Sequence, residues 1–339
     1  SILFLAYHYP PVRSGGVERT VKFQRYLPDF GYRARILTTS AFGPAGDVVG
    51  PWAQDVEQAW EPVGLYRRLA HRRRAGGPPP AAVRTDPGLL GPLRRLALDH
   101  LFVPDGQITW LPHALVVALR TVRRVPVSAL YSTYPPASAH LLGLLLKRLT
   151  ALPWLADFRD SWTDDPLDPA LPRHRLRLAV ERHLERRIVR AADLVVAATA
   201  RSAELLRPSC GGALDKLRVI PNGFDPEDTG PRTPIPPLPA GAPVRLVHTG
   251  AFSASHPHRS PAFLFAALGR LVAADPAWSS RLQLMLVGPL TPAEQMAVDM
   301  QFAQKEAMLQ ALAGSFILFV DTGDPQLLAT GDLGESAVA

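Results

Sequence analysis

The chain has 339 residues, of which 47% are hydrophobic and 20% charged, a composition typical of a soluble globular protein. The length favours two domains, and the formal net charge of +7 suits a polyanionic partner, a membrane surface or a diphosphate-bearing substrate. The single cysteine excludes an internal disulfide and a multi-cysteine metal site.

The chain opens with an apolar run, Ile2–Ala6, that leads to Gly15 and Gly16 and then to an amphipathic pattern over Val17–Leu27. The pattern predicts a buried strand, a glycine turn and a helix. Glycines let backbone N–H groups approach a ligand closely, and a helix N-terminus attracts anions. This opening therefore indicates a phosphate or sugar site, with a tight turn that binds nothing as the alternative.

Short apolar runs alternate with helical patterns up to residue 220, which predicts a parallel sheet wrapped by helices. The expected strands after the first are Arg35–Thr38, Ala129–Ser132, Pro153–Asp157, Leu194–Ala198 and Leu217–Ile220. The expected helices after the first are Leu111–Arg123, Ser138–Leu149 and Arg173–Arg190.

An insert near 67–95 carries five arginines (Arg67, Arg68, Arg72, Arg73 and Arg74) followed by a glycine- and proline-rich stretch. It is either a solvated loop or a basic lip that touches anionic lipid or an acceptor phosphate. Together with the apolar helix around 111–117, it hints at peripheral contact with the inner membrane face.

A proline-rich linker is expected at 221–243, after which a second sheet begins with Val244–Thr249. Helix Ala262–Ala273 and strand Gln283–Val287 follow, then helix Thr291–Ala313 and strand Ser315–Val320. We therefore expect an N-terminal domain over 1–220 and a C-terminal domain over 244–339, facing each other across a cleft. Too few elements follow Gly288 for a complete doubly wound domain, so we expect the C-terminal domain to be incomplete in this chain.

The sequence contains no run of about 18 apolar residues and does not begin with a signal-peptide pattern. These observations predict a cytoplasmic protein.

Five segments together resemble the large family of retaining GT-B glycosyltransferases, in its bacterial group-1 (family 4) branch. They are His8-Tyr-Pro-Pro with Gly15-Gly16-Val-Glu-Arg19, Tyr134-Pro-Pro-Ala-Ser-Ala-His140, Ala156-Asp-Phe-Arg-Asp-Ser-Trp162, Ile220-Pro-Asn-Gly-Phe-Asp225 and His248-Thr-Gly250. The resemblance covers roughly residues 1–290. It implies an α/β fold of two Rossmann-like domains, a nucleotide-diphosphate sugar as co-substrate, and neither a cofactor nor a catalytic metal.

The resemblance also implies where the donor would bind. Arg259 stands where the family carries a basic residue that clamps the diphosphate, a task for which the planar guanidinium is well suited. The other expected donor-binding residues are glycines or lie in a turn: Gly15, Gly16, Asn222, Gly223, Gly250 and Gly288. Asn222 and Gly223 alternatively have a structural role in the turn that enters the linker.

Acceptor and catalytic roles are expected for polar and aromatic residues of the N-terminal domain, and a catalytic role also for Arg259. Asp157, Arg159 and Asp160 lie at a predicted strand end, where ligands bind in such sheets, or they neutralise one another. Asp157, His140 and Arg259 are the catalytic candidates, and His140 is alternatively a structural histidine. Arg13, Arg159, Asp160 and Trp162 are the acceptor-binding candidates, for a lipid-linked, glycan or small-molecule glycoside acceptor; no nucleic acid is expected.

One family feature is missing from the sequence. The Glu-x7-Glu element that contacts the donor sugar has no match, which fits an incomplete C-terminal domain. Two alternatives remain: a nucleotide-sugar epimerase on the same fold, and a non-catalytic glycan- or nucleotide-binding homologue. A dehydrogenase is disfavoured because the first turn lacks Gly-x-Gly-x-x-Gly.

Overall fold

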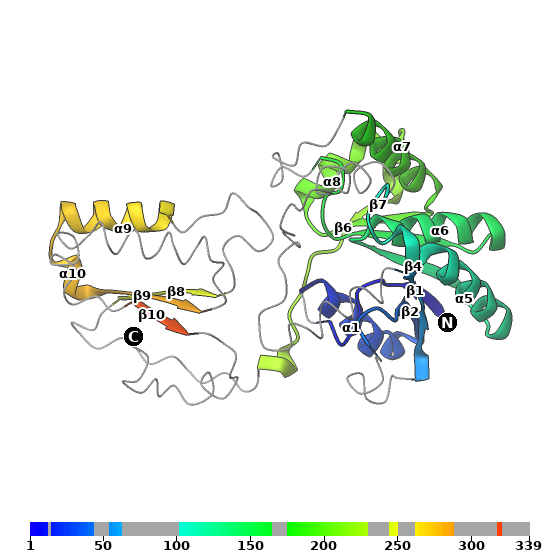
Figure 1. Ribbon diagram of the computed structural model, residues 1–339, viewed down its shortest axis with the longest axis horizontal. Helices are drawn as coiled ribbons and strands as arrows, with labels where there is room; N and C mark the ends of the chain where they lie inside the picture. Colours follow the sequence, from blue (N-terminus) through cyan, green and yellow to red (C-terminus); the bar gives the residue numbers. More distant parts are fainter. Residues whose placement is uncertain are drawn as a thin grey trace, which may run out of the picture. The chain divides into compact units, whose positions relative to one another are not determined.

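The computed structural model describes residues 1–12, 15–43, 54–62, 102–164, 175–229, 244–249, 262–287 and 317–320. The chain divides into two compact units (Figure 1). Unit 1 comprises Ser1–Gly77 and Thr85–Gly230, and unit 2 comprises Pro78–Arg84 and Pro231–Ala339. The expected insert near 67–95 lies outside the described residues, as does most of the expected linker. The predicted domain limits stay a prediction.

Unit 1 contains a seven-stranded sheet in the order β3-β2-β1-β4-β5-β6-β7, and its strand pairs are parallel. The sequence predicted every strand except β3, which is short and carries two polar residues among its four. The strands are β1 (Ile2–Leu5), β2 (Ala34–Thr39), β3 (Val56–Ala59), β4 (Ala129–Tyr134), β5 (Trp154–Phe158), β6 (Leu194–Ala197) and β7 (Leu217–Val219).

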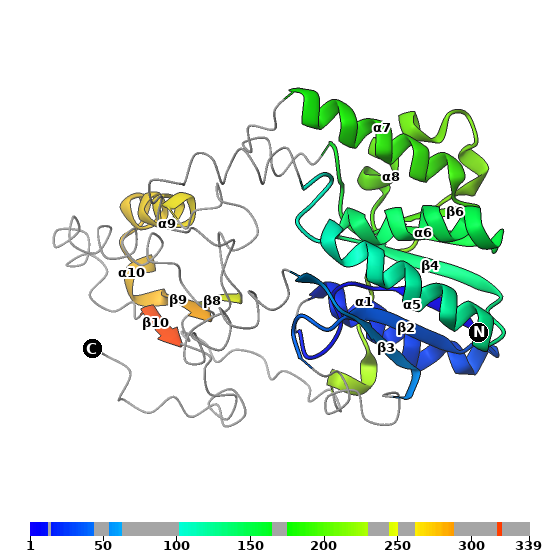
Figure 2. The ribbon, with the colours of Figure 1, turned by 45° about the vertical axis from the view of Figure 1, so that its right-hand side comes forward.

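Helices cover both faces of this sheet (Figure 2). Helix α1 packs on one face, while α5, α6, α7 and α8 pack on the other. The α-helices are α1 (Gly15–Tyr26), α5 (Leu111–Arg124), α6 (Ala137–Thr150), α7 (Arg175–Ala191) and α8 (Ala200–Leu206). The 3₁₀ turns are η1 (Leu27–Phe30), η3 (Ile108–Trp110), η4 (Arg207–Cys210), η5 (Leu214–Lys216) and η6 (Pro226–Thr229).

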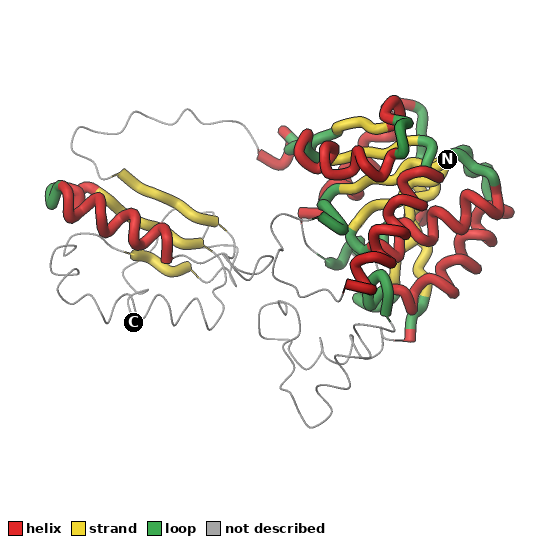
Figure 3. Tube along the Cα trace, turned by 90° about the horizontal axis from the view of Figure 1, so that it is seen from above, coloured by secondary structure: helices red, strands yellow, loops and turns green. Residues whose placement is uncertain are grey.

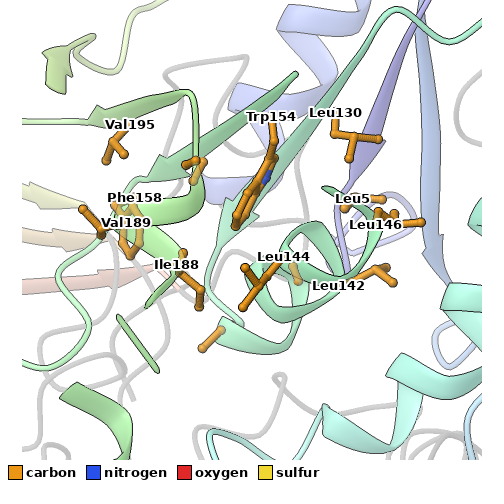
Figure 4. Close-up of a cluster of buried hydrophobic side chains, with 14 of the residues drawn as sticks. Leu5, Leu130, Leu142, Leu144, Leu146, Trp154, Phe158, Ile188, Val189 and Val195 are labelled. Atoms are coloured by element: carbon orange, nitrogen blue, oxygen red, sulfur yellow. The ribbon is translucent and has the colours of Figure 1, made fainter. Parts of the chain in front are cut away.

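The larger core lies between the sheet and helices α5, α6 and α7 (Figure 4). Trp154 is central to this core, with 1% of its surface exposed. The indole packs against Gly143 of α6, where an added Cβ would lie 2.5 Å from indole carbon Cε2. The absence of a side chain at Gly143 therefore allows α6 to approach β5 closely.

Unit 2 has a three-stranded parallel sheet in the order β10-β9-β8 (Figure 3). Its elements are β8 (Val244–Thr249), α9 (Ala262–Ala274), α10 (Trp278–Arg281), β9 (Leu282–Val287) and β10 (Ile317–Val320). These elements confirm the expected strands and the expected helix at 262–273. The expected helix Thr291–Ala313 lies outside the described residues. No helix among the described residues is long and apolar enough to cross a bilayer.

Candidate functional site

The predicted ligand site of unit 1 lies where the strand order reverses. The chain runs from β1 outward to β2 and β3, then returns to β4 on the other side of β1 and continues to β7. In open α/β sheets, ligands bind beyond the carboxyl ends of the strands at such a reversal. Gly15 and Gly16 begin α1 after β1, and Arg159 directly follows β5. Residues from distant parts of the sequence therefore gather at this edge of the sheet.

The Arg159 guanidinium lies against Gly16. A Cβ added to Gly16 would overlap the guanidinium, so only glycine leaves room for Arg159 in this position. The Arg159 side chain is 12% exposed, and its Nε lies 3.5 Å from Asp160 Oδ2. Because the first N–H groups of a helix lack intrahelical partners, the Arg159 cation and the start of α1 together favour an anionic group.

Arg19, one turn into α1, forms a buried ion pair with Asp157 of β5. Arg19 Nε lies 2.8 Å from Asp157 Oδ2, and Nη2 lies 3.2 Å from Oδ1. The guanidinium also donates to the carbonyl oxygens of Ile220 and Pro221, both at 3.0 Å, and to Asn222 Oδ1 at 3.3 Å. Arg19 thus joins the helix of the glycine turn to the segment that leaves β7.

Tyr131 of β4 completes the surroundings of Asp157. Its hydroxyl donates to Asp157 Oδ2. Burial raises the pKa of Tyr131 well above its usual value, and the adjacent carboxylate adds to this effect. The phenol therefore stays a neutral donor. Asp157 is 0% exposed, so its carboxylate is fully engaged by Arg19 and Tyr131.

Asp225 is a second anchor between α1 and the segment after β7. Its carboxylate accepts from Lys22 Nζ at 2.7 Å, from Tyr26 Oη at 2.8 Å and from Arg25 Nη1 at 3.3 Å. The hydrogen bond from Lys22 is the main reason why the pKa of Asp225 falls to about 2. Three residues of α1 therefore hold a single carboxylate.

His140, a catalytic candidate, lies in α6 and is 0% exposed. Its Nδ1 lies 2.7 Å from Ser132 Oγ, which also accepts from Trp154 Nε1 at 2.9 Å. Its Nε2 is buried without a hydrogen-bond partner. Burial lowers the pKa of His140 to about 3, so the imidazole is neutral at physiological pH. The structure thus places His140 within the core of unit 1.

The remaining candidates of unit 1 differ in exposure. Trp162 is 3% exposed, and its ring stacks on Tyr134 with centroids 6.0 Å apart. The Asp160 side chain is 59% exposed. Asn222 and Gly223 are exposed, and a Cβ on Gly223 would meet nothing within 4 Å. Their predicted ligand contacts stay predictions.

Four candidates lie outside the described residues: Arg13, Gly250, Arg259 and Gly288. The described residues contain no group of three or more His, Cys, Asp or Glu side chains that could hold a metal ion. The metal-free mechanism stays a prediction.

Sequence reasoning missed Arg19 and Tyr131. The amphipathic pattern of α1 placed Arg19 among its polar residues, yet Arg19 is only 8% exposed. Tyr131 lies within the expected strand Ala129–Ser132, and nothing in the sequence indicates a further role for it. The sequence carried one signal for Arg19, which is its position one helical turn after the glycine pair.

Comparison with known families decides the identity of the chain. The model of the glycosyl transferase 4-like domain matches residues 14–223, which is more than half of the chain. The chain belongs to the glycosyl transferase 4-like family. The matched range begins at the glycine turn and ends beside Asn222, so it contains Arg19, Asp157 and Arg159. A comparison with curated proteins found no match.

Several solved structures share the fold of this glycosyltransferase. An α,α-trehalose-phosphate synthase (UDP-forming) from Burkholderia vietnamiensis has a TM-score of 0.54 and is 13% identical. The match covers 97% of this chain and 74% of the synthase chain. Sucrose-phosphate synthase from Thermosynechococcus elongatus has a TM-score of 0.52 and 14% identity, with coverages of 97% and 72%. These similarities and the parallel sheets confirm the predicted α/β, GT-B fold.

Proposed function

We propose that the chain is a retaining glycosyltransferase that moves a sugar from a nucleotide-diphosphate sugar to an acceptor hydroxyl. The observation that carries the proposal is the Arg159 guanidinium against Gly16, at the start of α1 and beyond the carboxyl end of β1. A cation beside free helix N–H groups favours the negative charge that develops when a diphosphate departs.

In this mechanism the acceptor oxygen attacks the anomeric carbon as the bond from that carbon to the phosphate oxygen breaks. The bonding electrons stay with the diphosphate, and the acceptor proton passes to a phosphate oxygen. The new bond forms on the face that the leaving group vacates, which retains the configuration. The protein supplies cations and N–H dipoles rather than a strong base or a metal.

We assign the donor diphosphate to Arg259, Gly250, Gly15 and Gly16, and the nucleotide base to Gly288. We retain Asn222 and Gly223 as further donor contacts. A structural relative supports a nucleotide-sugar donor, because a trehalose-6-phosphate protein from E. coli with 14% identity and a TM-score of 0.50 was determined with bound UDP-2-fluoro glucose. It covers 97% of this chain, which spans 76% of that protein.

We assign the acceptor, a sugar-like molecule with a free hydroxyl, to Arg13, Asp160 and Arg159. For the Arg159 guanidinium we propose a position between the acceptor and the departing diphosphate. For Asp157 we propose a positioning role, because its buried carboxylate holds Arg19. A neutral His140 in the core is suited to orienting Ser132 rather than to taking up a proton.

The first test is a thermal-shift experiment with UDP, GDP, ADP and dTDP. A ligand at 100 times its dissociation constant stabilises the fold by about 2.7 kcal/mol. We expect one diphosphate to raise the melting temperature of the wild type but not of Arg259→Ala. Arg120→Ala, at an exposed position of α5, is the matched control and should respond like the wild type. If no diphosphate shifts the melting temperature, the donor site is wrong.

A second measurement separates transfer from binding alone. Proton NMR of the product, formed with the preferred nucleotide sugar and a simple glycoside acceptor, reports the anomeric configuration. Retention of the donor configuration supports the proposal. Inversion contradicts the retaining mechanism, whereas binding without turnover favours a non-catalytic homologue.

A further inference from the structure

Helix α7 separates its charged residues by sign. Its acids, Glu181 and Glu185, are 2% and 4% exposed and face the interior of unit 1. Arg177 Nε pairs with Glu181 Oε1 at 2.8 Å, while Ser209 and Thr163 hydroxyls donate to Glu185 at 2.7 and 2.9 Å. The acidic side chains of α7 therefore do not lie on its solvent-exposed surface.

The outer face of α7 is basic and partly apolar. At 100° per residue, its exposed residues fall within an arc of about 160°. None of them is acidic: they are Arg175, Leu176, Ala179, Val180, Arg182, His183, Arg186, Arg187 and Arg190. We call this set the α7 face. Figures 1 and 2 show α7 at the outer border of unit 1.

The ion pairs of α7 leave most of this charge uncompensated. Among the described residues, Arg182 has an acidic partner, Asp164, at 2.7 Å. Arg175, Arg186 and Arg187 form no ion pair within the part of the chain that the structure describes. Like charges crowded on one helix repel one another, so a negatively charged partner would stabilise the arrangement.

The apolar side chains of the α7 face favour an anionic bilayer over a nucleic acid as the partner. Leu176 is 64% exposed and Val180 is 40% exposed, and they lie one helical turn apart on the same arc as the arginines. Phosphate contacts to nucleic acids require only cations and hydrogen-bond donors. A bilayer interface additionally accepts apolar side chains between its head groups, which is the pattern of an interfacial helix.

We propose that the α7 face docks on an anionic lipid bilayer, with Arg186, Arg187 and Arg190 against the head groups and Leu176 and Val180 inserted beside them. The proposal is independent of the glycosyltransferase mechanism, because none of these residues belongs to the assigned donor or acceptor site. It places the membrane contact on α7, rather than on the arginine-rich insert near 67–95.

Co-sedimentation with vesicles tests the proposal. We expect the full chain to bind vesicles of phosphatidylglycerol and phosphatidylcholine, and not vesicles of phosphatidylcholine alone. The triple variant Arg186→Gln/Arg187→Gln/Arg190→Gln should bind about tenfold more weakly or worse, because each basic residue near an anionic surface contributes appreciably. The matched control is Arg120→Gln/Arg123→Gln/Arg124→Gln on the exposed face of α5, which removes the same charge and should bind nearly as the wild type does.

A second variant tests the apolar part. Leu176→Ser/Val180→Ser should lose most of the vesicle binding that survives at 0.5 M salt, where screening weakens the arginine contribution. Circular dichroism checks that each variant is folded. The proposal would be overturned if the α5 and α7 triple variants lost vesicle binding equally, or if the wild type did not bind the anionic vesicles. It would also be overturned if the wild type bound single-stranded DNA as tightly as these vesicles.

Discussion

Arg19 and Asp157 form a buried ion pair across two elements that are 138 residues apart in the sequence. Their side chains are 5% and 0% exposed. The pair links the helix that follows the glycine turn to the strand that precedes Arg159. The contact between the Arg19 guanidinium and the Asp157 carboxylate therefore joins the two elements that carry the candidate anion-binding groups, which are the start of α1 and Arg159.

Replacing Asp157 should strongly destabilise the fold. Asp157→Asn leaves the Arg19 charge buried without its counter-ion, which typically costs about 3–5 kcal/mol. Urea unfolding followed by circular dichroism measures the loss. Glu204→Gln, which breaks the exposed Arg201–Glu204 pair, is the control and should change stability little. An Asp157→Asn variant as stable as the control would mean that the pair is not formed.

Two glycine substitutions should differ in their effects, one mainly on the stability of the fold and the other mainly on ligand binding. Gly143→Ala pushes a methyl group into the Trp154 indole and should cost about 1–3 kcal/mol, because a packed core cannot absorb the added volume. Gly16→Ala meets the movable end of Arg159, so we expect a smaller loss of stability but clearly weaker binding of the nucleotide diphosphate or acceptor. Parallel unfolding and binding measurements separate the two effects. A Gly16→Ala variant that binds normally would argue against a ligand at this turn.

The buried His140 should make stability depend on pH. Burial lowers its pKa from the ordinary 6.5 to about 3 in the folded chain, so below pH 6.5 the unfolded chain binds a proton that the folded chain does not. Stability is therefore fully present above pH 6.5 and falls as the pH drops toward 3, by up to about 1.4 kcal/mol per pH unit.

Urea unfolding between pH 7.5 and pH 5 tests this dependence on His140. The slope should shrink in His140→Gln and persist in His183→Gln, which changes an exposed histidine of α7. An unchanged slope in His140→Gln would assign the pH dependence to other groups.

Asp225 should stabilise the folded structure of residues 220–229, the segment that follows β7. Asp225→Asn weakens the contacts to Lys22, Arg25 and Tyr26, so the amides of residues 220–229 should exchange hydrogen faster. Hydrogen-exchange mass spectrometry of peptides from this segment measures the effect. Glu227→Gln removes a carboxylate that is 66% exposed and should change exchange much less. Equal exchange in wild type and Asp225→Asn would show that Arg19 alone holds the segment.

The α/β architecture is predictable from the amino-acid sequence, because strand and helix periodicities are local properties of the chain. The sequence also located the glycine turn, the strand end at Asp157 and the Pro-Asn-Gly turn. It missed β3, whose Val-Glu-Gln-Ala lacks the apolar run of a buried strand.

Which of these residues come into contact depends on the folded arrangement of the strands. The order β3-β2-β1-β4-β5-β6-β7 brings the ends of β1 and β5 to one edge of the sheet, and no local pattern encodes that neighbourhood. The burial of Arg19, the neutral state of His140 and the space at Gly16 for Arg159 follow from this packing. The free energy of a charge or a glycine is set by what surrounds it in space, and the groups around Arg19 and Gly16 come from segments more than a hundred residues away.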